Sequence, residues 1–266
     1  MGEAPRDDIA VKKGPSEATV RVTRRISDTV IIVGAVLLIW QGLAEWVGET
    51  ALSAPGPTLA YMWDFVPSER FAINALSTAI TFGWALLIAY GLGLAIGIWM
   101  GAHRLSGAVG EPILVTLYSL PKITLYPVIL LIFGLSIGGK VTFGAIHGVL
   151  PVALLTMAAI RNIPRVYLKS ARTLHLSPWQ TITKVLLPAT LPEVVAGLRI
   201  GFTVTLFGVL LSEMFASRHG LGFLIVNAMA LLQTREMISV AVVLFAFAAV
   251  ANALLLWMEH RMHRRV

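Results

Sequence analysis

Five basic side chains lie in a short segment that separates two long apolar runs of this chain. They are Arg161, Arg165, Lys169, Arg172 and Lys184, and the next acidic residue is Glu193. A structured, strictly basic segment favours binding over catalysis, because positive side chains on one surface attract and orient an acidic partner. The segment is therefore predicted to be a docking surface. The alternative is a basic loop that faces solvent or lipid headgroups.

Local signals predict two short helices in this segment. Pro164 suits the first turn of a helix, where its missing N–H would be unpaired anyway, and this helix should run to about Leu174. The run Ser177-Pro178-Trp179-Gln180 supplies an N-cap, a proline at the first helical position and a capping-box glutamine. Leu187-Pro188 is expected to end the second helix, because a proline disfavours helical geometry in the residue before it.

Composition shows that membrane spans must position this segment. The chain has 266 residues, of which 57% are hydrophobic and 13% are charged, and its mean hydropathy is +0.80. Soluble domains carry about 25% charged residues, so most of this chain's surface must face lipid. The absence of cysteine excludes disulfides and thiolate metal sites. The net charge of +7 does not indicate nucleic acid, because the basic residues flank apolar segments.

Six segments have the length of roughly 20 apolar residues that a membrane helix needs. They are residues 29–48, 73–101, 112–135, 141–160, 193–215 and 238–258. The sequence thus predicts an all-α, polytopic domain over 29–260, between a largely disordered tail (1–28) and a basic tail (261–266). With the N-terminus in the cytoplasm, most of the 21 lysines and arginines lie on the cytoplasmic side, as the positive-inside rule requires. Both termini and residues 161–188 are therefore predicted to be cytoplasmic.

Two stretches on the opposite side are not simple loops. In residues 51–71, the run SAPGP should prevent a continuous helix into the second span. Residues 217–236 contain an apolar run too short to span, which favours a half-inserted or interfacial helix.

Glycines recur along one face of the second span. Gly93, Gly97 and Gly101 have four-residue spacing, which lets helix backbones approach closely. Close packing of this face inside the bundle is the favoured interpretation. A tight interface between helices that move against each other is the alternative.

Two patterns that could indicate other chemistry are rejected. Residues 134–140 nearly match a phosphate-binding loop, but Val141 replaces the Ser or Thr that would hold magnesium. The histidines His103, His147, His175, His219, His260 and His263 have no convincing metal-ligand spacing with carboxylates. No catalytic residue, nucleotide site, metal site or cofactor is therefore expected in this chain.

The basic segment resembles the signature of the inner-membrane permeases of binding-protein-dependent ABC importers. That signature is Glu-Ala-Ala, a Gly four residues later, and Ile-x-Leu-Pro after nine more. Here the matching positions are Lys169-Ser170-Ala171, His175 and Val185-Leu186-Leu187-Pro188, with every spacing intact. SAPGPT, SLPKITLYPVILLIFG and SEMFASRHGLGFLI also resemble the family, so the likeness covers roughly residues 50–265. It is greatest to the branch that imports sulfonates, taurine, nitrate and similar solutes.

The resemblance implies a MetI-like permease fold with six transmembrane helices in the cell inner membrane. It also implies two cytoplasmic ATPase subunits that bind the ATP, an extracytoplasmic solute-binding protein and a second permease copy about a two-fold axis. The ATPase-coupling positions that it implies are Lys169, Ser170, Ala171, Arg172, Leu174, His175, Val185, Leu187 and Pro188.

Two positions depart from the family pattern. His175 replaces the glycine at a turn that often needs positive φ, which histidine tolerates better than most residues, at a cost of about 1 kcal/mol. Lys169 replaces the glutamate, so with Arg165 it forms a strictly basic face. The partner ATPase is therefore expected to be acidic at the matching groove.

Charged residues inside predicted spans are costly in lipid and usually face a cavity or a partner. Lys122, between Pro121 and Pro127, is a candidate for an anion permeation path; the alternative is a lysine that snorkels or pairs with Glu111 or Glu213. Glu213 is a candidate for gating that path or contacting the binding protein, but a structural hydrogen-bond role is the favoured interpretation. A third charge, Arg199, lies close enough to the inner boundary to snorkel.

The function predicted from these features is ATP-driven import of a small solute, with an organic or inorganic anion favoured. A gradient-driven secondary transporter or channel is the alternative, and it would usually carry more intramembrane carboxylates. A non-transporting membrane scaffold would give no reason for Lys122 or for an ordered docking segment.

Overall fold

The computed structural model describes residues 17–263, and within that range the chain is helical, with no strand. The long helices are α1 (Glu17–Val47), α3 (Glu69–Ala102), α6 (Ile137–Arg161), α9 (Leu187–Phe215) and α11 (Thr234–His263). The shorter ones are α2 (Pro55–Phe65), α4 (Arg104–Ser119), α5 (Tyr126–Phe133), α7 (Arg165–Thr173), α8 (Pro178–Thr181) and α10 (Leu221–Ala230), with the 3₁₀-helix η1 (Lys122–Leu125) and the π-helix η2 (Ile182–Leu186).

Five of the described helices are long and apolar enough to cross a membrane, and a bent pair supplies a sixth candidate. The single straight span predicted over 112–135 is wrong. Instead, α4 and the η1–α5 segment meet at 87°. The break follows from Pro121, which forces Leu120 into extended geometry (ψ 140°) and ends α4.

Tertiary contacts hold the bent segment in place. Tyr126 of α5 is 3% exposed, and its hydroxyl donates a 2.7 Å hydrogen bond to the Ser212 carbonyl of α9. The Tyr126 ring packs against Phe143 of α6, with ring centroids 4.7 Å apart. The short helix α5 is therefore tied to two long helices at once.

The described residues divide into two compact units, one that ends at Pro57 and one that begins at Thr58. In the first, α1 begins at Glu17, before the end of the disordered tail expected over 1–28; residues 1–16 lie outside the described part. The Trp40 Nε1 group donates a 3.0 Å hydrogen bond to the Ser53 carbonyl, which ties the end of α1 to the SAPGP stretch. As expected, no continuous helix crosses that stretch.

The second unit is built around α6, which packs against both α3 and α9. In the 18-residue apolar stretch that makes α6 long enough to span a membrane, 67% of the residues are buried inside the protein, compared with 17% in the corresponding stretch of α11. The predicted glycine face of α3 lies against α6. Added Cβ atoms at Gly93 and Gly101 would meet Val152 and Ile160 at 2.7 and 2.9 Å. The tight helix interface predicted from the spacing is present.

Replacing Gly97 with alanine should lower the free energy of unfolding by about 1 to 3 kcal/mol, because overpacking forces the neighbours to move. The new Cβ would lie 2.6 Å from Thr156 Cβ and 2.7 Å from the Ala153 carbonyl oxygen. Gly91→Ala is the matched control on the same helix, since nothing lies within 4 Å of its added Cβ. Unfolding midpoints of both variants in one detergent test this, and equal midpoints would contradict the packing argument.

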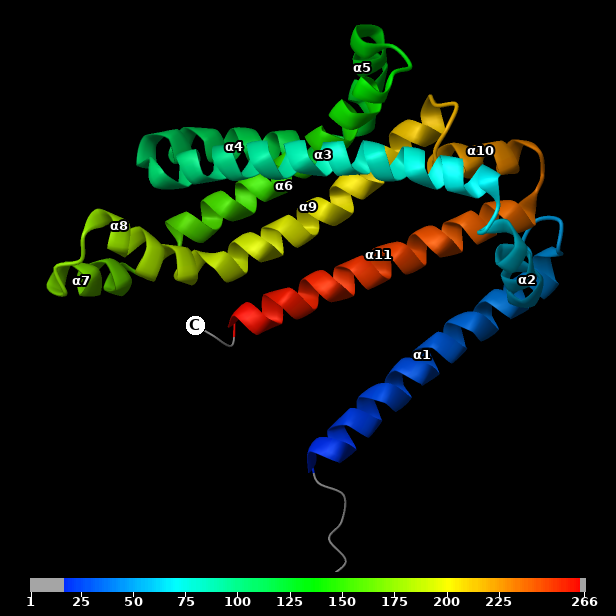
Figure 1. The fold of residues 1–266 in the computed structure, drawn as a ribbon, viewed down its shortest axis with the longest axis horizontal. Helices are drawn as coiled ribbons and strands as arrows, with labels where there is room; N and C mark the ends of the chain where they lie inside the picture. The colour runs from blue at the N-terminus through cyan, green and yellow to red at the C-terminus, as the bar shows by residue number, and fades with distance from the viewer. Residues whose placement is uncertain (1–16, 264–266) are drawn as a thin grey trace, which may run out of the picture. The chain divides into compact units, whose positions relative to one another are not determined.

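The connections of the second unit lie at two ends of its long helices. Figure 1 shows the α3–α4 turn, the α7–α8 segment and the C-terminal end of α11 towards one end, with α10 and the start of α11 at the other. At the first end lies Arg199, the residue that the sequence places close enough to the inner boundary to snorkel. Its Nε lies 3.0 Å from Glu259 Oε2 of α11, so the charge is paired within the protein.

Candidate coupling loop and central cavity

The first short helix of the basic segment, α7, ends in a backbone motif centred on His175. This residue has φ 51°, in the left-handed region expected for it. The Leu176 N–H donates to the Ala171 carbonyl and the His175 N–H to the Arg172 carbonyl, both at 3.0 Å. These bonds form a Schellman motif. His175 Nδ1 also lies 3.0 Å from the Arg172 carbonyl oxygen.

The predicted capping box at the second short helix is present. The Gln180 N–H donates to Ser177 Oγ (3.2 Å), and the Ser177 N–H donates to Gln180 Oε1 (3.0 Å). Both short helices are therefore fixed by local hydrogen bonds, which defines the turn between them.

The prediction that Leu187-Pro188 ends the second helix is wrong. From Trp179 to Phe215 the chain forms one apolar helical stretch, in which α8 passes through η2 directly into α9. In η2 the Leu187 N–H donates to the Ile182 carbonyl, one residue further back than in an α-helix. This wider turn lies just before Pro188, which cannot donate a backbone hydrogen bond, so the helix continues past the proline.

The candidate coupling positions divide into exposed and covered ones. Ala171 is 3% exposed and anchors α7, whereas Leu174 is 70% exposed. Lys169, Ser170, Arg172, His175 and Leu187 are exposed, and Val185 and Pro188 are half-buried. The segment thus presents a basic surface with apolar side chains such as Leu174 within it. We use the name coupling loop for residues 161–188.

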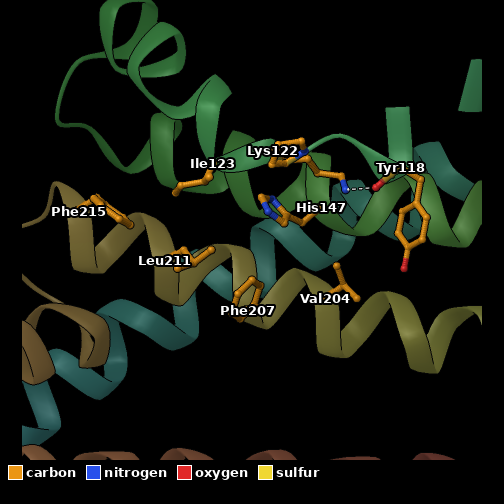
Figure 2. Close-up of a pocket in the computed structure, with 9 residues that line it drawn as sticks. Tyr118, Lys122, Ile123, His147, Val204, Phe207, Leu211 and Phe215 are labelled. Atoms are coloured by element: carbon orange, nitrogen blue, oxygen red, sulfur yellow. Dashed lines mark hydrogen bonds between the residues drawn. The ribbon is translucent and has the colours of Figure 1, made fainter. Parts of the chain in front are cut away.

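Helix α9 connects the coupling loop to a cavity of about 590 Å³. Figure 2 shows Val204, Phe207, Leu211 and Phe215 of α9 along one side of it. Tyr118, Pro121, Lys122 and Ile123 of the bent segment and His147 of α6 complete the lining. Of these residues, the sequence analysis selected Lys122 as a site candidate but not His147. The feature that could have identified His147 is its position as a polar residue within an apolar span.

Lys122 makes its contacts within the bent segment. Its Nζ donates a 2.8 Å hydrogen bond to the Tyr118 carbonyl and lies 4.8 Å from the centre of the Tyr118 ring. The carboxylates considered as partners are engaged elsewhere: Glu111 pairs with Arg161, and Glu213 binds α10.

Glu213 is not among the residues that line this cavity. It is 1% exposed and accepts hydrogen bonds from Thr78 Oγ1 of α3 (2.8 Å) and from the Gly222 N–H (3.0 Å) at the start of α10. Thr78 Oγ1 in turn accepts from the Leu221 N–H at 2.8 Å. The structure therefore places Glu213 as a buried cap on α10, because the first N–H groups of a helix have no partner within it.

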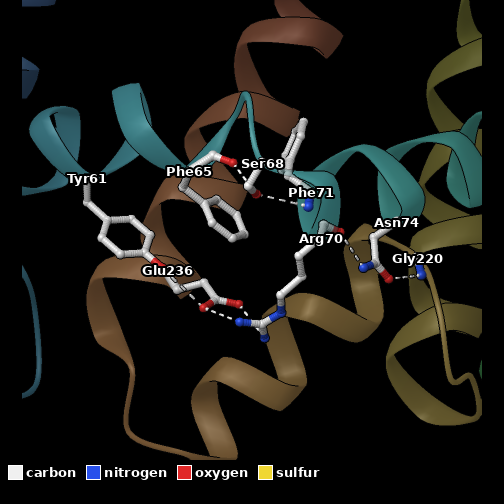
Figure 3. A network of polar contacts seen from close by, with 8 residues as sticks. All are labelled: Tyr61, Phe65, Ser68, Arg70, Phe71, Asn74, Gly220 and Glu236. Carbon is white, nitrogen blue, oxygen red and sulfur yellow. Dashed lines mark hydrogen bonds and ion pairs between the residues drawn. The ribbon is translucent and has the colours of Figure 1, made fainter.

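Neighbouring polar side chains complete this cap. Figure 3 shows the Gly220 N–H donating to Asn74 Oδ1, at 2.8 Å, and Asn74 Nδ2 donating to the Arg70 carbonyl, at 2.7 Å. Gly220 has φ 125°, and a Cβ there would overlap the Glu213 carboxyl group. Helices α3, α9 and α10 are joined at one point by these bonds.

The Arg70 side chain belongs to a second network, shown in Figure 3. Its guanidinium pairs with Glu236 of α11 at 2.8 Å, and the Tyr61 hydroxyl donates to Glu236 Oε2 at 3.2 Å. Burial and the Glu236 carboxylate raise the pKa of Tyr61, so its hydroxyl stays protonated and continues to donate. The start of α11 is thereby tied to α2 and α3.

Comparisons with known proteins agree with this arrangement. Residues 93–266 match the family described as "Binding-protein-dependent transport system inner membrane component". The chain is similar to a probable ABC transporter permease protein of Haemophilus influenzae (strain Rd), with 29% identity over 89% of this chain and 97% of that protein. It is also similar to the nitrate import permease protein of Leptolyngbya laminosa, with 30% identity over 78% of this chain and 77% of that protein.

Among solved structures, the chain resembles one from inward-facing conformations of the MetNI methionine ABC transporter. The TM-score is 0.59 at 19% identity, over 77% of this chain and 97% of that one. At that identity the likeness shows the fold alone. The predicted MetI-like, all-helical fold is confirmed.

Proposed function

Since this chain belongs to the family of binding-protein-dependent transport system inner membrane components, we propose that two copies of it form the path by which an ABC importer moves a small anion. It is a non-enzymatic permease subunit of an ABC importer. The finer assignments are a partner ATPase at the coupling loop, a solute-binding protein on the opposite side, and an anionic solute.

The observation that carries the proposal is the continuous helix from the coupling loop to the cavity. Residues 179–215 run without a break from the loop into α9, which supplies Val204, Phe207, Leu211 and Phe215 to the cavity wall. A displacement of the loop would therefore move the wall. ATP binding would close the ATPases, push on the coupling loop and open the path outward, and hydrolysis would reset it.

The charge of the loop indicates the partner's surface. Lys169 and Arg172 are exposed on α7, and the basic stretch has no acidic residue before Glu193. We expect an acidic groove on the ATPase, with apolar space for Leu174, which is 70% exposed. The coupling loop would then be cytoplasmic, and so would both termini and the end of the second unit where α11 finishes.

Two findings support a small anion as the solute. Lys122 supplies a positive charge to the cavity, and the relative from Leptolyngbya laminosa is named as a nitrate import permease. A second copy of the chain would complete the path, with the solute-binding protein docking at the end of the unit where α10 lies.

Reconstitution in lipid vesicles tests this function. The permease is combined with its candidate ATPase, with and without its solute-binding protein. The expected result is ATP hydrolysis stimulated by the loaded binding protein, together with solute accumulation, both lost in Leu174→Asp. Because Leu174 is exposed, this variant should fold normally. Solute flux without the ATPase would instead identify a gradient-driven carrier.

A further inference from the structure

Lys122 and His147 line the same cavity from different elements, with Lys122 on η1 and His147 on α6 (Figure 2). An ammonium group has three N–H donors, and one of those on Lys122 is used by the Tyr118 carbonyl, so two remain for a ligand. His147 Nδ1 lies 2.8 Å from the Phe143 carbonyl oxygen. Because a carbonyl can only accept, Nδ1 carries the proton, and Nε2 is the nitrogen left to interact with the cavity's contents.

These polar groups indicate what the cavity wall faces. A lysine beside a histidine would be costly against acyl chains, so such groups in membrane segments face a passage or a partner instead. Phe207 and Phe215 lie on the same wall and are 57% and 64% exposed. Their rings are therefore available to a ligand in the cavity.

Three aromatic side chains contribute to the cavity wall, beside the aliphatic Ile123, Val204 and Leu211 and the ring of Pro121. Tyr118, Phe207 and Phe215 carry phenyl rings, and the His147 ring lies edge-to-face with Phe207 at 6.4 Å between centroids. Aromatic rings with centroids about 4.5–7 Å apart stabilise each other by more than the burial of their apolar area accounts for. The volume of about 590 Å³ is within the range of small-molecule sites. Lys122 is the cation of this lining, and no carboxylate is among the described residues that form it.

We propose that this cavity binds an aromatic monoanion, such as an arylsulfonate or arylcarboxylate. Its anionic group binds Lys122, and its ring packs against Phe207 and Phe215. His147 adds a second N–H to the anionic group when Nε2 is protonated. The inference rests on the proposed function as an anion permease and narrows the solute to anions that carry a ring.

The test uses the complete permease–ATPase complex in lipid nanodiscs, without nucleotide and without binding protein. Any preference among ligands then comes from the permease itself. Calorimetric titration compares benzenesulfonate with cyclohexanesulfonate, neutral benzamide and nitrate. We expect benzenesulfonate to bind most tightly, because it alone combines the charge with an aromatic ring.

Two variants with matched controls separate the charge from the ring. Lys122→Gln should weaken the binding of both sulfonates at least about tenfold, since a charge-assisted hydrogen bond is lost. Lys140→Gln should leave the affinity for both sulfonates unchanged, because Lys140 binds Ser217 and does not line the cavity. Phe207→Leu should weaken the binding of benzenesulfonate about threefold and leave the affinity for cyclohexanesulfonate unchanged. Phe245→Leu, at a 77% exposed position on α11, should affect neither.

In the binding experiment, the proposal is overturned if benzenesulfonate binds no more tightly than nitrate, benzamide or cyclohexanesulfonate, or if the Lys122→Gln complex binds like Lys140→Gln. The proposed function is judged separately, by ATP-driven uptake in vesicles. Uptake that survives Lys122→Gln refutes the site and leaves the importer function intact. Lys122-dependent binding without any ATP-driven uptake refutes the function and leaves the site intact.

Discussion

Replacing Glu213 with alanine should lower the free energy of unfolding by more than about 3 kcal/mol, because two buried donors lose their acceptor at once. The Thr78 hydroxyl and the Gly222 N–H both donate to this carboxylate, at 2.8 and 3.0 Å. Each unsatisfied buried donor costs about 1–3 kcal/mol, and the missing side chain also leaves a void. The measurement is the unfolding midpoint in detergent.

Two other substitutions control for this result. Glu193→Ala removes an exposed carboxylate from the same helix and should change stability by less than about 0.5 kcal/mol. Glu213→Gln keeps one oxygen acceptor, so its loss should be intermediate. If Glu213→Ala were as stable as Glu193→Ala, the cap on α10 would contribute nothing to folding. A Glu213→Ala protein that folds stably but fails to transport would support the gating role instead.

Replacing Lys169 with glutamate should weaken binding of the ATPase at least about tenfold at low salt, because two units of charge change on a surface proposed to face an acidic groove. Lys169 is exposed on α7, so the variant should fold as the natural chain does. The loss should shrink as salt is added, since exposed charges are screened beyond a Debye length of about 8–10 Å. Pull-down of the ATPase over a series of salt concentrations measures this.

Arg104→Glu is the matched control for charge. Arg104 is exposed and is the first residue of α4, directly after the α3–α4 turn. That turn lies towards the same end of the second unit as the coupling loop but is not part of it (Figure 1). It should leave the affinity nearly unchanged. Binding of Lys169→Glu at natural strength would refute charge pairing and leave a loop that faces solvent or lipid headgroups.

Some structure could be predicted because it depends on neighbours along the chain. The Ser177–Gln180 capping box joins residues three apart, and the His175 turn is closed by bonds within α7 and the residues that follow it. The four-residue spacing of Gly93, Gly97 and Gly101 likewise places all three on one helix face. Such features follow from backbone geometry alone.

Pro188 and Pro121 show where this local reasoning is insufficient. The sequence predicts a helix end at Leu187-Pro188 and a straight span through Pro121. The π-helix η2 lets the helix continue at Pro188, whereas the chain turns by 87° near Pro121. The bent segment is held by Tyr126, which bonds to Ser212 far along the chain. A proline fixes a local restriction, and the surrounding packing decides how it is accommodated.

By itself, the sequence determined the membrane character, most of the spans and the short helices of the coupling loop, because apolar length and local capping are properties of contiguous residues. Only the tertiary structure decided what the charged and polar side chains do. Thr78 and Glu213 are 135 residues apart in sequence yet share a hydrogen bond, and Lys122 and His147 line one cavity from separate helices. Such contacts depend on which helix faces meet, and the free energy that selects among them comes from packing over the whole bundle.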